Sequence, residues 1–223
     1  NELHNMKHMS ILAVSLLALV ACTPEKKQEA DYSQYVNPMI GTDFTGNTYP
    51  GAQVPFGMVQ LSPDNGLPGW DRISGYFYPD TTIAGFSHTH LSGTGAGDLY
   101  DISFMPVTRP YKEAPAPLGI YSTFSHNDEA ASAGYYRVLL KDYNINVELT
   151  ATERCGIQRY TFPEAEASVF LNLKKAMNWD FTLDSKIEVV DSTTIRGYRL
   201  SQGWSPLQHV YFETRFSKPF VAC

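Results

Sequence analysis

Apolar and polar residues alternate along the second half of the chain. The run Tyr143–Thr150 (YNINVELT) places Ile145, Val147 and Leu149 on one face and polar residues on the other. This period of two is typical of an antiparallel strand with one buried face. Similar runs, most of them bounded by Gly, Pro, Asp or Ser, occur at Tyr135–Leu140, Gly156–Phe162, Val169–Leu173, Lys186–Val190, Thr194–Leu200 and Gln208–Phe216. Many short strands at this spacing, without a sustained helical period, predict an all-β fold, an antiparallel β-sandwich.

A different pattern occupies the stretch from Asn37 to Met105, where glycine, proline and aromatic residues are concentrated. Gly and Pro fix turns that need unusual backbone angles. Aromatic side chains held between such turns suit flat, polar ligands with one apolar face, of which sugars are the commonest. This segment is therefore the first place to look for a ligand site. A loop at Tyr111–Leu118 separates it from the alternating strands.

The N-terminus has the pattern of a targeting segment. Met6 and Lys7 give a short basic start, and Ser10–Ala21 is apolar but too short to cross a bilayer as a mature helix. The apolar run ends in Leu-Val-Ala followed by Cys22, which looks like a bacterial lipobox. Lipidation of Cys22 would anchor the protein stably in the outer membrane. A plain secretory signal with an incidental cysteine is the alternative.

These patterns divide the chain into three parts. Residues 1–22 are assigned to a lipoprotein signal peptide, with extra residues before the first methionine. Residues 23–34 form a polar tether, and residues 35–223 form the predicted β-sandwich. The chain ends just after a predicted strand, which suggests a fragment of a longer protein.

Composition and charge exclude some functions. The net charge of the 223 residues is −6, and no basic block is present that would neutralise nucleic-acid phosphates. Apart from Cys22, the cysteines are Cys155 and Cys223, and their spacing fits neither a disulfide framework nor a zinc site. Cys155 lies in a strand-like run and is expected to be a small buried residue.

Trp70 is the best single ligand candidate. It is flanked by Gly69 and Asp71 in a loop, where a core role is less natural, although a loop tryptophan can also fold back on the sandwich. Trp204, in a Gly-Trp-Ser sequence, leaves the same two interpretations open. Trp179, between Asn178 and Asp180, is the weaker candidate.

His88 and His90 stand two residues apart in Ser-His-Thr-His. On an extended chain they point to the same face. Such a pair can bind a metal, but no third ligand is identifiable, so a packed or locally hydrogen-bonded histidine is favoured over a metal site. Recognition of sugar hydroxyls by His88 or His90 is the third interpretation.

The carboxylates of this segment also have two interpretations. Glycosidases use two carboxylates, as acid and base or as acid and nucleophile. Asp64 in Asp-Asn-Gly fits a turn, and Asp98 fits a cap of the glycine-rich loop Leu91–Asp98. That loop lacks the Gly-Lys-Ser/Thr ending of a phosphate loop, so tight turns beside a pocket explain it better than nucleotide binding.

The sequence from Tyr35 onward resembles glycoside hydrolase family 92, the calcium-dependent exo-α-mannosidases. The resemblance rests on motifs in matching order and spacing: Val36–Thr42 (VNPMIGT), Tyr49–Asp64 (YPGAQVPFGMVQLSPD), Ser74–Gly95, Gly97–Pro106 and Gly203–Phe220. It implies an N-terminal β-sandwich followed by an (α/α)₆ barrel, with the active site between them. It also implies hydrolysis of terminal α-mannosides, including those of N-glycans, with inversion, in a secreted or lipid-anchored bacterial protein.

The resemblance also implies where the functional residues lie. The general acid, the general base and most calcium ligands are expected in the barrel, so no catalytic residue and no metal ligand is assigned in this chain, which alone is expected to be inactive. Trp70 matches the tryptophan near the leaving-group sugar, and Asp71, His88 and His90 are expected to join it in substrate binding.

Three positions depart from the family pattern and leave the linkage specificity open. The loop Asp43–Thr48 lacks a histidine, Arg72 replaces a second tryptophan, and Ala96 replaces a cysteine. Two other functions stay open: a non-catalytic carbohydrate-binding module, and a structural surface lipoprotein without a sugar site. In each case the expected location is the bacterial cell envelope, in the periplasm or on the cell surface.

Overall fold

The computed structural model describes residues 30–108, 119–164, 166–174 and 179–221. The chain divides into two units, Asn1–Tyr32 and Ser33–Cys223, and the strands belong to the second. Cys22, the predicted signal peptide and most of the predicted tether lie outside the described residues. Within the described part of the chain, no helix is long and apolar enough to cross a membrane.

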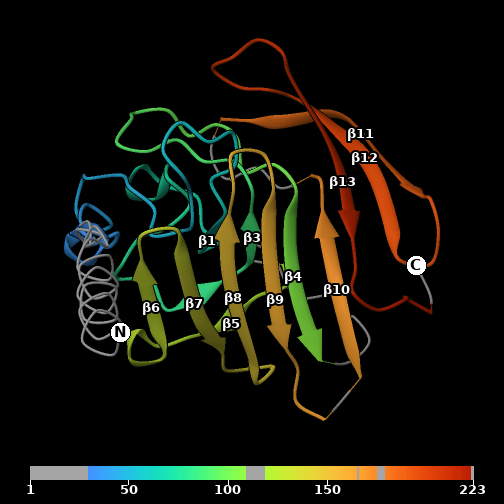
Figure 1. Ribbon diagram of the computed structural model, residues 1–223. Helices are drawn as coiled ribbons and strands as arrows, with labels where there is room; N and C mark the ends of the chain where they lie inside the picture. The colour runs from blue at the N-terminus through green and yellow to red at the C-terminus, as the bar shows by residue number, and fades with distance from the viewer. Residues whose placement is uncertain (1–29, 109–118, 165, 175–178, 222–223) are drawn as a thin grey trace, which may run out of the picture. The chain divides into compact units, whose positions relative to one another are not determined.

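The described residues form antiparallel sheets and short 3₁₀ turns, and no α-helix occurs among them (Figure 1). The strands are β1 Ser62–Asp64, β2 Thr82–Ile83, β3 Gly85–Ser87, β4 Ser103–Thr108, β5 Ser122–Thr123, β6 Glu129–Ser132, β7 Tyr135–Leu140, β8 Ile145–Ala151, β9 Gly156–Thr161, β10 Ala167–Asn172, β11 Phe181–Val189, β12 Thr194–Gln202 and β13 Gln208–Arg215. The 3₁₀ turns are Ser33–Tyr35, Trp70–Arg72 and His126–Asp128. The all-β prediction is confirmed.

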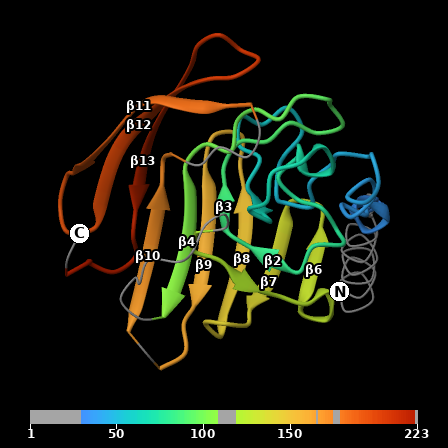
Figure 2. The ribbon, with the colours of Figure 1, turned by 180° about the vertical axis from the view of Figure 1, so that it is seen from behind.

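The described strands form four sheets, with the orders β1-β3-β4-β10, β6-β7-β8-β9, β11-β12-β13 and β2-β5. Figures 1 and 2 show β6 to β9 running side by side as a meander. In β8 the predicted alternation holds, because Ile145, Val147 and Leu149 are buried while Asn146 is exposed. The strand begins after Asn144, whose φ of 50° forms the turn from β7, a conformation that asparagine tolerates better than most residues.

β4 connects the two hydrophobic clusters of the fold. All six of its side chains are buried, and successive side chains of a strand point to opposite faces. Met105 and Val107 belong to the main core, which also contains buried residues of β3, β7 and β8. Phe104 belongs to a smaller cluster with Ile102 and Leu173, against which Val210 and Phe212 of β13 pack. The β11-β12-β13 sheet is therefore attached through this second cluster.

One prediction about the fold is wrong. Cys155 is exposed, because it lies in the β8–β9 turn rather than in a strand. The Thr152 N–H donates to the Cys155 carbonyl at 2.8 Å, and the Cys155 N–H donates to the Thr152 hydroxyl at 3.2 Å. The alternation that marks β8 and β9 stops at this turn.

Candidate functional site

All three tryptophans of the chain are exposed, and two of them line one pocket. Trp70 lies in the 3₁₀ turn after Gly69, Trp179 precedes β11, and Trp204 follows β12. Their exposed fractions are 56%, 49% and 77%. A pocket of about 600 Å³ is lined by Thr94, Gly95, Trp179, Gly203 and Trp204. We call it the tryptophan pocket.

Trp70 lies at the rim of the tryptophan pocket. Its ring centroid is 6.2 Å from that of Trp179, with the ring planes tilted by 55°. Its other neighbour is Gly95, where an added Cβ would be 3.3 Å from the Cη2 atom of Trp70. The glycine therefore lets the loop approach the indole ring. A tryptophan has a large apolar surface, and burying that surface stabilises a fold. Three exposed tryptophans therefore indicate a binding surface.

A buried carboxylate supports the wall that carries Trp204. Asp98 is 3% exposed, and its Oδ2 accepts a hydrogen bond of 3.2 Å from the Ser205 N–H. Its Oδ1 has no hydrogen-bond partner among the described residues. An added Cβ at Gly203 would lie 2.4 Å from this oxygen, so only glycine fits between Asp98 and the pocket.

A buried ionic network supports the wall that carries Trp179. The Arg199 guanidinium, 1% exposed, donates to Asp101 Oδ1 at 2.5 Å and to Asp180 Oδ1 at 2.8 Å. Its Nε donates to the Leu173 carbonyl at 3.1 Å, and Asp180 also accepts from the Leu99 N–H at 3.1 Å. Burial raises the pKa of Asp180, and the hydrogen bond from Arg199 opposes that rise. Arg199, Asp101 and Asp180 are called the Arg199 network below.

His90 was expected to bind substrate, and the structure places it in the interior instead. Its side chain and that of Asp64 are both 0% exposed, with 2.8 Å between His90 Nε2 and Asp64 Oδ1. Its Nδ1 lies 2.7 Å from the Gln60 carbonyl oxygen. Both ring nitrogens thus have partners in the protein, and the His90 side chain is fully buried in this chain.

His88 is partly buried on the same inward side. Its Nδ1 is 2.7 Å from the Ile102 carbonyl oxygen, and its ring meets Phe104 edge-on at 5.7 Å. Burial lowers its pKa, which the hydrogen bond to Ile102 opposes. Both histidines thus contact protein groups, and neither lines the tryptophan pocket.

Asp71 remains beside Trp70 in the same 3₁₀ turn and is half-buried. The neighbouring Arg72 is held by Asp80 through two hydrogen bonds of 2.6 and 2.5 Å. The pKa of Arg72 is raised, first by its hydrogen bond with Asp80 and to a smaller extent by the charge of Asp71. The Arg72–Asp80 pair fixes the turn that presents Trp70.

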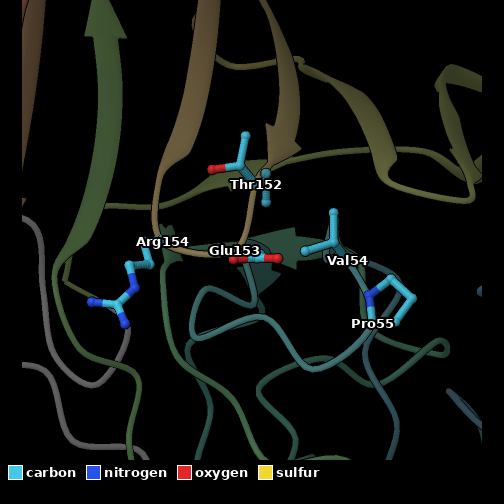
Figure 3. Close-up of a pocket in the computed structure, with 6 residues that line it drawn as sticks. Val54, Pro55, Thr152, Glu153 and Arg154 are labelled. Atoms are coloured by element: carbon cyan, nitrogen blue, oxygen red, sulfur yellow. The ribbon is translucent and has the colours of Figure 1, made fainter.

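A second pocket of about 590 Å³ lies between a loop and the β8–β9 turn (Figure 3). Its lining residues are Val54, Pro55, Ala151, Thr152, Glu153 and Arg154. The Met58 N–H donates to the Glu153 carbonyl at 2.7 Å and joins the loop to the turn. None of these described lining residues is aromatic, so this pocket offers no flat surface for a sugar ring.

Metal ligands were expected mostly outside this chain. Among the residues that the structure describes, no group of three or more His, Cys, Asp or Glu side chains could hold a metal ion.

Sequence reasoning found part of the tryptophan pocket. Trp70 and Trp204 were recognisable because each follows a glycine in a polar loop. Trp179 is the weaker candidate in the sequence because it lies between Asn178 and Asp180. In the structure Asp180 accepts a hydrogen bond from Arg199, 19 residues away. Nothing in the local sequence shows that pairing.

Comparisons of the sequence and of the structure with known proteins point to the same family. Residues 35–223 match the glycosyl hydrolase family 92 N-terminal domain. A family GH92 α-mannosidase from Bacteroides thetaiotaomicron, solved with mannoimidazole, is 43% identical, with a TM-score of 0.81 over 85% of this chain and 26% of its own. An inverting family GH92 mannosidase from the same organism is 28% identical, with a TM-score of 0.68 over 87% of this chain and 26% of its own.

A curated relative, an uncharacterized secreted glycosidase from Arthroderma benhamiae, is 26% identical over 172 residues, which are 73% of this chain and 21% of the relative. The chain thus spans about a quarter of the length of these relatives. The family match covers all but the first 34 residues, so the chain belongs to glycosyl hydrolase family 92 and contains its N-terminal domain.

Proposed function

We propose that the protein hydrolyses terminal α-mannosides of glycans with inversion, and that this chain supplies one wall of the substrate site. The observation that carries the proposal is the tryptophan pocket in a chain 43% identical to an α-mannosidase. Pyranose rings present C–H groups on one face, and these groups pack favourably on the electron-rich face of an indole.

The acid and base of this reaction are proposed to lie outside this chain. In an inverting glycosidase one carboxylic acid protonates the leaving oxygen while a second carboxylate activates water. Asp64, Asp98 and Asp101 are at most 3% exposed, and all three contact protein groups. A substrate cannot reach these three carboxylates in this state, so none of them is proposed as the acid or the base.

The first test is to incubate the protein with an activated aryl α-mannoside and follow the anomeric proton of the product by NMR. Inversion predicts that β-mannose forms first and then mutarotates. Initial formation of α-mannose would contradict inversion. Binding of mannosides without turnover would favour the alternative, a carbohydrate-binding module.

Trp70→Ala tests whether Trp70, at the rim of the tryptophan pocket, contacts the substrate. Loss of one stacking contact should lower kcat/KM by about ten- to thirtyfold, which corresponds to about 1–2 kcal/mol. If Trp70 meets the leaving-group sugar, the loss should be larger for a mannose disaccharide than for an aryl mannoside. Equal losses for both substrates, together with a lower Tm, would assign Trp70 a packing role instead.

Calcium dependence and lipid anchoring belong to the same proposal. Chelation should abolish mannoside hydrolysis, and added calcium should restore it; full activity after chelation would remove calcium from the proposal. Cys22→Ser should move the protein from the membrane fraction to the soluble fraction. Unchanged membrane association, with no lipid mass on Cys22, would leave only a secretory signal.

A further inference from the structure

The tryptophan pocket contains more aromatic surface than one sugar contact requires. Trp70 is the tryptophan that the family resemblance connects with substrate. Trp179 and Trp204 line the pocket together with Gly203, Gly95 and Thr94. We infer that Trp179 and Trp204 form a carbohydrate subsite of their own, which binds a further sugar ring of a neutral oligosaccharide.

The chemistry of the lining selects the ligand. Of the described residues that line the pocket, none carries a charge. Two indole rings offer apolar faces, and the glycine backbones and the Thr94 hydroxyl offer polar atoms. This combination fits a neutral ligand with C–H faces and hydroxyl groups, which is a carbohydrate. The net charge of −6 further disfavours anionic glycans.

The volume of the pocket is large enough for a sugar ring. Its volume of about 600 Å³ lies within the range of ~300–1,000 Å³ that is usual for pockets of drug-sized ligands. Trp70 borders the same space, with its centroid 6.2 Å from that of Trp179. Trp70 and Trp179 are therefore adjacent, and Trp179 and Trp204 line the same pocket.

The backbone beneath both tryptophans is held rigidly. Trp179 is followed by Asp180, which receives hydrogen bonds from the Arg199 guanidinium at 2.8 and 3.0 Å. Trp204 is followed by Ser205, whose N–H donates to the buried Asp98. Two exposed tryptophans are thus each adjacent to a residue fixed by a buried charge. Such preorganisation lowers the entropy that a ligand must remove on binding.

The test is calorimetric binding of an α-linked mannotriose and of methyl α-mannoside to the protein, comparing Trp204→Ala with the parent under chelation, so that hydrolysis does not consume the ligand. The subsite predicts that Trp204→Ala weakens mannotriose binding by about tenfold or more and leaves methyl α-mannoside binding unchanged. Trp204→Phe should restore part of the loss, because a smaller aromatic face remains. Tyr211→Ala is the matched control, since Tyr211 is 68% exposed on β13 but does not line the pocket.

Equal binding of mannotriose by Trp204→Ala and the parent would overturn the inference, as would equal losses for Tyr211→Ala. The inference rests on the proposed mannosidase function, yet the two can fail separately. If aryl α-mannosides are hydrolysed but Trp204 has no effect on mannotriose, the subsite is wrong and the function stands. If no mannoside is hydrolysed but mannotriose binding depends on Trp204, the subsite stands and the activity is wrong.

Discussion

The Arg199 network and the tryptophan pocket lie next to each other and reverse the usual distribution of side chains. Arginine is almost never fully buried without a partner, and tryptophan is mostly buried. Here the Arg199 side chain is 1% exposed, whereas Trp204 is 77% exposed. The two regions are connected through the backbone, because Asp180 of the network follows Trp179 of the pocket.

The contrast in burial suggests that the Arg199 network serves stability and the tryptophan pocket serves ligand binding. The buried charges tie loops that contain little apolar surface: the Arg199 network joins Leu99 and Asp101 to the start of β11. The three tryptophans keep about half or more of their surface exposed. Substitutions in the network should therefore change stability, and substitutions in the pocket should change binding.

Removal of Arg199 should have the largest effect on stability. Arg199→Ala leaves Asp101 and Asp180 buried without their cation, and loss of one partner from a buried ion pair costs about 3–5 kcal/mol. Urea unfolding should show this loss as a lower midpoint. Arg196→Ala is the matched control on the same strand, since its pair with Glu188 is 54% and 43% exposed and should contribute at most about 1 kcal/mol. Similar midpoints for the two variants would contradict the contrast.

His90→Ala should have the next largest effect. The substitution removes the hydrogen bonds of the His90 ring with the Asp64 carboxylate and with the Gln60 carbonyl, both in a buried region. Loss of buried hydrogen bonds, one of them to a charged group, costs about 2–3 kcal/mol. Differential scanning calorimetry should show a clearly lower Tm, whereas His209→Ala, at an exposed position of β13, should not. An unchanged Tm for His90→Ala would mean that the interior pair is dispensable, and would reopen the sugar-binding role for His90.

The pH dependence of stability should come from the interior rather than from the pocket. Burial lowers the pKa of His88 below its ordinary value of about 6.5. Between the lowered value and 6.5 the unfolded chain binds a proton that the folded chain does not, so the free energy of unfolding rises with pH in that window. One such proton gives a slope of at most about 1.4 kcal/mol per pH unit.

Urea unfolding from pH 7 down to pH 5.5 tests this prediction, with stability expected to fall as the pH is lowered. His88→Gln should flatten the curve in this range relative to the parent, since glutamine cannot titrate. His209→Gln should leave the slope unchanged. Parallel curves for the parent and His88→Gln would assign the slope to other groups.

The alternating strands were predictable from the sequence, and the glycine-rich half was not. β7 matches its predicted bounds, and β8, β9, β10, β12 and β13 agree within a few residues. In β8, β9 and β13 more buried and more exposed residues alternate, as the sequence pattern predicts. β11 begins five residues before the predicted Lys186, since a register shift between Thr182 and Asp184 breaks the alternation. β4 has six buried residues and therefore no alternation to detect.

The candidate site was predictable only where local sequence sets exposure. A glycine before Trp70 and before Trp204 marks a loop, and both are exposed. The spacing of His88 and His90 predicts a shared face, but a period of two cannot show whether a side chain lies inside the protein or on its surface. His90 is buried because Asp64, 26 residues earlier, supplies its partner. The burial of His90 thus depends on pairing with a residue far away in the sequence, and no local sequence pattern shows that pairing.

The smallest effect on stability is expected in the tryptophan pocket, which completes the contrast. Trp204→Ala removes a large side chain, but most of that surface is already in contact with water in the folded chain. Exposed substitutions away from caps, turns with special backbone angles and buried partners usually change stability by no more than about 0.5 kcal/mol. The Asp98–Ser205 hydrogen bond, which fixes the loop, uses the backbone N–H and survives the substitution. The urea midpoint of Trp204→Ala should therefore equal that of the parent within this margin, even where mannotriose binding is lost. A stability loss above about 1 kcal/mol would show that Trp204 packs on the fold, and any loss of binding would then reflect a disturbed loop rather than a missing sugar contact.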